Sequence, residues 1–143
     1  SLALAEFAGL HLAHCWEPIS QGMMRLWGDD EDAEKISDWV NTEHLRHQEG
    51  LERLAIKLRT WIGNAAHEYL RPLSHLLKGS ALETIPALVQ RFEIDVLVMG
   101  SAGRSGISGL IIGNTAETLL NILPCDLLVI KASHLVSTTM SSA

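Results

Sequence analysis

The sequence predicts an α/β protein in which helices cover both faces of an open, twisted parallel sheet. Three observations lead to this prediction. Apolar segments of strand length alternate with helical patterns along the chain. The segment 95–99 is apolar without interruption after its first residue, which is typical of a strand covered on both faces. The chain has 143 residues, of which 47% are hydrophobic and 20% charged, as in one globular domain.

The elements are expected in the order helix, strand, helix, strand, helix, strand, helix, strand. The first helix ends at Gly9, a residue that readily caps helices. In the long helix, apolar residues recur every three or four positions and predict one inward stripe. That stripe comprises Ile36, Val40, His44, His47, Leu51, Leu54, Leu58 and Trp61. The expected strands are 10–17, 73–77, 95–99 and 126–130, and the expected helices are 1–9, 33–62, 82–92 and 115–123. Pro86 suits the first turn of its helix better than the middle.

Composition narrows the classes of function. The net charge of −6 disfavours binding to nucleic acid or to anionic lipid, because no basic surplus displaces counterions. No apolar run approaches the roughly 20 residues that cross a bilayer, and the first residues do not resemble a signal peptide. Cys15 and Cys125 each lie in an apolar run, which favours a reduced, cytoplasmic protein, with a single disulfide as the alternative. The tail 132–143 is expected to be disordered.

The histidines raise the question of a metal site. His44 and His47 are one helical turn apart, which is a workable spacing for two zinc ligands. They also fall on the apolar stripe, so partial burial is the simpler interpretation. His11 and His14 are three apart in a strand and should point to opposite faces, so they cannot share a metal. No companion at ligand spacing is evident for His75, and no metal site is predicted.

A glycine-rich segment follows the third strand. Gly100, Gly103 and Gly113 precede a helical pattern, and the expected strand ends just before them. Backbone N–H groups without a nearby Cβ, together with a helix N-terminus, favour phosphate binding. The alternative is a tight turn that needs glycine only for packing. The segment is neither a Walker A loop nor a G-x-G-x-x-G fingerprint.

The spacing Gly100-x2-Gly103-x9-Gly113, followed by Asn-Thr-Ala-Glu and later by Pro-Cys-Asp-Leu-Leu-Val-Ile, resembles the C-terminal half of a universal stress protein. The wording GRSGISGLIIGNTAE is similar to the branch of that family found as tandem-domain proteins, in which it would belong to the second domain. The resemblance implies one domain over residues 1–131 that binds ATP, with Mg²⁺ accompanying the nucleotide. The binding residues that it implies are Met99, Gly100, Gly103, Arg104, Gly113, Asn114 and Thr115.

Two departures from the family pattern bear on this expectation. Position 114 is Asn where the family has Ser or Thr, although its amide still donates a hydrogen bond. The family's first strand, which lies centrally in the sheet and ends in an Asp that contacts adenine, has no counterpart in these residues. We therefore expect that the sequence is a fragment of a longer chain.

The last strand suggests how the domain associates. The run 127–130 is apolar and would lie at the edge of the sheet, where an open strand invites pairing. The resemblance implies a homodimer or a tandem-domain pair joined through Leu127 to Ile130. The sequence thus predicts a cytoplasmic stress-response module that binds ATP or a related nucleotide and dimerises. The alternative is a structural pairing module whose degenerate site binds another metabolite or none. No catalytic residue is predicted, because neither Ser105 nor Ser108 forms G-x-S-x-G, and at most slow ATP hydrolysis is expected.

Overall fold

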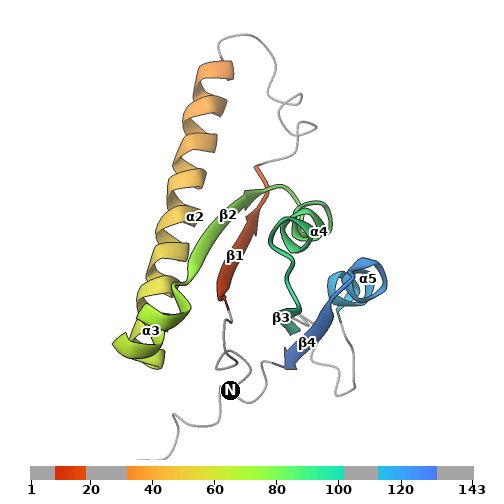
Figure 1. The fold of residues 1–143 in the computed structure, drawn as a ribbon. Coiled ribbons are helices and arrows are strands. Elements are labelled where there is room, and N and C mark those ends of the chain that lie inside the picture. The colour runs from red at the N-terminus through yellow and green to blue at the C-terminus, as the bar shows by residue number, and fades with distance from the viewer. Residues whose placement is uncertain (1–8, 19–31, 102–112, 132–143) are drawn as a thin grey trace, which may run out of the picture. The chain divides into compact units, whose positions relative to one another are not determined.

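A computed structural model describes residues 9–18, 32–101 and 113–131 (Figure 1). The chain divides into two compact units, Ser1–Ser80 and Ala81–Ala143. The expected helix 1–9, apart from Gly9, and the expected disorder of the tail 132–143 lie outside the described residues. The single domain 1–131 also stays a prediction. None of the described helices is long and apolar enough to cross a bilayer.

In the first unit, the described residues form two parallel strands and two helices. Strand β1 (His11–Trp16) pairs in parallel with β2 (Leu73–Lys78), and the 31-residue helix α2 (Asp32–Ile62) packs against both strands. A short helix, α3 (Asn64–Leu70), links α2 to β2 and was not predicted from the sequence. Its seven residues are too few for a clear helical periodicity. The buried core of this unit is formed by Trp16, Leu51 and Leu70.

The second unit has the same strand–helix alternation. Helix α4 (Ala81–Phe92) precedes β3 (Val96–Ser101), and helix α5 (Asn114–Ile122) precedes β4 (Asp126–Lys131). Strands β3 and β4 pair in parallel, with Gly100 beside Ile130. The two helices pack on each other, and α5 also contacts β4. The buried side chains of this unit are Ile85, Leu88, Val89, Ala116 and Leu119.

These elements confirm the α/β class with parallel strands, and their bounds differ from the expected ones by only a residue or two. The four described strands form two separate pairs, β1–β2 and β3–β4, and no ladder among the described residues joins them.

Two details of the helices were predicted wrongly. Leu54 and Trp61, which were assigned to the inward stripe of α2, are 43% and 75% exposed. Trp61 lies about 21 Å along the helix axis from His47, because fourteen residues rise about 1.5 Å each. A six-residue strand of about 20 Å does not extend under the whole helix. Pro86 lies inside α4 rather than in its first turn, so the helix lacks one interior hydrogen bond there.

Candidate functional site

The candidate site is formed by the end of β3 and the beginning of α5, which both belong to the second unit. Met99 and Gly100 belong to the last half of β3. Gly113 is the N-cap residue of α5, and Asn114 and Thr115 are its first two residues. Gly103 and Arg104, which were also predicted to bind the ligand, lie outside the described residues.

Neither described glycine of the motif is required by the backbone or by local packing. Gly113 has φ −56° and ψ 151°, a conformation open to other residues, and a Cβ there would meet no atom within 4 Å. A Cβ at Gly100 would lie 3.9 Å from the carbonyl oxygen of Ile130, an ordinary contact. The space beside each Cα is therefore open within the described chain, and the tight-turn alternative concerns a loop that lies mostly outside it.

The N-terminus of α5 offers hydrogen-bond donors. The first hydrogen bond of the helix runs from the N–H of Glu117 to the carbonyl oxygen of Gly113, at 3.0 Å. The N–H groups of Asn114, Thr115 and Ala116 consequently have no acceptor within the helix. Gly113 provides no side-chain cap for them. These donors and the positive end of the helix dipole can together bind an anion such as a phosphate group.

The side chains at this terminus are compatible with a polar ligand. Asn114 and Thr115 are both exposed, and their amide and hydroxyl groups can donate further hydrogen bonds. Glu117 also lies in the first turn and is exposed, so its carboxylate opposes a bound anion. Water screens an exposed charge of this kind strongly, so the opposition is modest.

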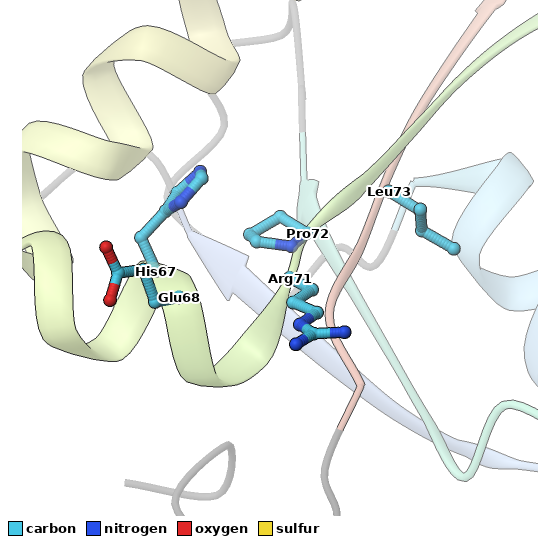
Figure 2. A pocket seen from close by; sticks show the side chains of 5 residues that line it. All are labelled: His67, Glu68, Arg71, Pro72 and Leu73. Atoms are coloured by element: carbon cyan, nitrogen blue, oxygen red, sulfur yellow. The ribbon is translucent and has the colours of Figure 1, made fainter.

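A surface hollow in the first unit lies at the negative end of a helix dipole, whereas the start of α5 is a positive end. It is lined by His67, Glu68, Arg71, Pro72 and Leu73, where α3 ends and β2 begins (Figure 2). This is the C-terminal end of a helix, where the dipole is negative and disfavours phosphate. The backbone N–H of Arg71 already donates to the carbonyl oxygen of His67, at 2.9 Å. The hollow is therefore a poorer phosphate site than the N-terminus of α5.

The histidines meet in pairs that the sequence did not reveal. His14 on β1 is hydrogen-bonded to His47 on α2, with 2.8 Å between Nε2 and Nδ1. His11 is hydrogen-bonded to His75 on the neighbouring strand, with 2.9 Å between Nδ1 and Nε2. His75 thus has a companion, contrary to the expectation. The pairing of these two strands is the signal from which the contact could have been predicted. It sets His75 opposite Ala13, two positions along β1 from His11. His11 and His14 do bond to different elements, as their spacing predicts. The described residues contain no group of three or more side chains able to hold a metal ion.

The chain was compared with protein families and curated sequences. The model of the universal stress protein family matches residues 1–131. Universal stress protein E of Escherichia coli (strain K12) is 46% identical over 59 residues, which cover 41% of this chain and 19% of that protein. Universal stress protein MJ0531 of Methanocaldococcus jannaschii is 26% identical over 98 residues, covering 68% of this chain and 52% of that protein. The match with the Escherichia coli protein thus spans about a fifth of its length.

A solved structure agrees at the level of the fold. The universal stress protein UspA from Lactobacillus plantarum superposes with a TM-score of 0.60 and 17% sequence identity. The superposition covers 86% of this chain and 77% of that chain. At this identity the likeness supports the α/β fold alone.

Proposed function

Because the chain belongs to the universal stress protein family, a family of stress-response proteins, we propose that it binds ATP or a related nucleotide between the end of β3 and the N-terminus of α5. The single observation that carries the proposal is the open space beside Gly100 and Gly113, which neither the backbone nor the packing of the described residues explains. A cytoplasmic location is part of the same proposal, and so is association through β4.

Each residue of the proposed site has a distinct role. Gly100 and, from the sequence, Gly103 let the ribose and phosphates approach the backbone without meeting a Cβ. The N–H groups at the start of α5 bind the outer phosphates, and Asn114 and Thr115 add side-chain donors. Arg104 supplies a positive charge to the phosphates, and Mg²⁺ accompanies the nucleotide. The chain's own residues bind and orient the ligand in this proposal, and no catalytic group is assigned.

The test is a substitution that fills the open space without harming the strand. Gly100→Val places a β-branched residue, favoured in strands, at an exposed position of β3 where a Cβ is tolerated. The variant should be as stable as the wild type or more stable by roughly 0.5–1 kcal/mol. Its affinity for Mg·ATP, measured by calorimetry, should fall at least tenfold because the side chain occupies the place of the ligand.

The matched control is Gly50→Ala in α2, where an added Cβ makes only an ordinary contact of 3.9 Å with Arg53. This variant should bind Mg·ATP like the wild type. Equal affinity of Gly100→Val and the wild type would refute the proposed site, provided that both are folded.

A second candidate function is a pairing module without a nucleotide. It is favoured by β4, which among the described residues pairs on one side only and exposes Leu128 and Ile130 by 45% and 52%. Under this alternative, neither the wild type nor Gly100→Val binds Mg·ATP. Both then sediment as dimers in analytical ultracentrifugation.

A further inference from the structure

The contact between β1 and α2 contains a hydrogen bond between two ionisable rings. His14 Nε2 and His47 Nδ1 are 2.8 Å apart, and both residues are half-buried. The other ring nitrogen of His47, Nε2, lies 3.7 Å from a carboxylate oxygen of Glu43 one turn earlier in α2. A carboxylate at this position favours the tautomer with the proton on Nε2, which leaves the Nδ1 lone pair free to accept from His14.

This hydrogen bond depends on the number of protons that the pair carries. Two neutral imidazoles form it, because one ring donates an N–H and the other accepts. An imidazole and an imidazolium also form it, with the charge strengthening the bond. Two imidazolium rings have no acceptor between them and repel each other. The second proton therefore removes the bond and replaces attraction with repulsion.

Apart from Glu43, the described surroundings of the pair supply no counter-charge for that second proton. Trp16 is 4% exposed, its ring stacks on His47 with 5.6 Å between centroids, and it meets His44 edge-on at 5.4 Å. From β2 the neighbour of His14 is the apolar Leu76.

Three charged groups among the described residues bear on the pair. Glu43 is also hydrogen-bonded to the exposed Arg46, at 3.3 Å, so its charge is shared. Lys78 pairs with Trp16 in the sheet register and adds positive charge at that end of β1. Burial, and then the neighbouring His47, lower the pKa of His14. Every neighbour except Glu43 thus leaves a doubly protonated pair unfavourable.

We propose that the His14–His47 pair is a proton-operated latch, which holds α2 on β1 when it carries at most one extra proton and releases the helix when it is doubly protonated. The buried Trp16 lies directly under the latch, and its indole Nε1 has no hydrogen-bond partner among the described groups. Release of α2 would give this N–H access to water, which lowers the cost of opening. The latch responds to acidification and does not depend on nucleotide binding.

The direction of the pH dependence follows from proton counting. The pKa of His14 is lower in the folded chain than the ordinary value of about 6.5. The open form therefore binds more protons than the latched form in the range below that value. The latch stabilises the contact between α2 and β1 fully above about pH 6.5. This stabilisation declines as the pH falls from there through the lowered pKa of His14.

The experiment is a titration of the full chain from pH 8 to pH 5 with a chelator present, so that only protons act. Imidazole ¹⁵N spectra follow each histidine, and amide hydrogen exchange follows α2. His14 should titrate below the ordinary histidine range, because burial and the neighbouring ring of His47 oppose its protonation. The protection factors of α2 amides near His47 should fall by up to tenfold per pH unit as the pH drops from about 6.5 through the lowered pKa of His14, which corresponds to uptake of one proton on opening.

Two variants complete the test. His47→Gln removes one ring of the latch but leaves the burial of His14, so the protection of α2 should depend on pH more weakly in this range than in the wild type. His67→Gln in α3 removes a half-buried histidine outside the latch and should behave like the wild type. The proposal is overturned if His14 titrates at the ordinary histidine pKa in the wild type. It is equally overturned if α2 keeps its protection down to pH 5, and these readouts need only the unaltered chain.

Discussion

Helix α5 is fixed to the second unit by a narrow apolar face, which a single substitution can test. Leu119 is 1% exposed, and Leu120, the next residue, is 53% exposed. Leu→Ala at a fully buried site lowers the free energy of unfolding by about 2–5 kcal/mol. The loss falls in the lower half of that range where neighbouring side chains can move into the cavity. The described part of the second unit comprises four elements, so we expect a loss of about 3 kcal/mol for Leu119→Ala.

The matched variant Leu120→Ala removes the same atoms from a half-exposed position. Full burial of a leucine side chain contributes roughly 2 kcal/mol of transfer free energy, and about half of that is lost at this position. The higher helix propensity of Ala offsets part of this loss. The expected loss is about 0.5 kcal/mol, so the two variants should differ by about 2.5 kcal/mol. Urea unfolding followed by circular dichroism measures this difference as a shift of roughly 1 M or more in the midpoint. Equal midpoints would refute the packing of α5 through Leu119, and with it the position of the N–H groups that are proposed to bind phosphate.

Two further predictions concern residues near the ends of elements. Arg71 has φ 43°, in the left-handed region, so Arg71→Gly should raise the free energy of unfolding by about 1 kcal/mol in urea titrations, because glycine adopts this conformation without strain. An unchanged or lower midpoint would contradict this reasoning. Burial raises the pKa of the Cys125 thiol, and at pH 8 its alkylation by iodoacetamide should therefore be slower than that of a cysteine in an unstructured peptide; a rate equal to the peptide's would contradict the effect of burial.

The course of the elements was readable from the sequence because most of them have strong patterns. Strand β3 is a run of apolar residues, and α2 repeats apolar residues over eight turns. Helix α3 escaped prediction because seven residues around Ala65, Ala66 and Tyr69 do not establish a period. The exposure of Trp61 was not predicted from the sequence for another reason. Periodicity gives the face of a helix on which a residue lies, and the length of the partner decides whether that face is covered.

The candidate site was predictable only as a motif. The glycine spacing and the helix start could be read from the sequence. The structure places Met99 and Gly100 in the last half of β3 and places Gly113, Asn114 and Thr115 at the start of α5, and their role in binding stays a prediction. Histidine pairs are different, because they depend on which residues face each other across elements. His14 and His47 are 33 residues apart, and the register of α2 on β1 that joins them is a product of packing.

The energetics of the two glycines provide the strongest argument that their role concerns a ligand. Glycine inside a strand costs roughly 0.5–1 kcal/mol relative to alanine, and glycine at an N-cap lacks the side-chain oxygen that stabilises a helix start. Gly63 has a structural reason to be glycine, since its φ is +82°. Gly100 and Gly113 show no positive φ, and a Cβ at either would make no close contact with the described residues. A residue that lowers stability at its own position, with no local interaction that offsets the loss, is typical of functional sites. A bound phosphate at the start of α5 would offset both costs, because it needs the space beside Gly100 and replaces the missing cap at Gly113.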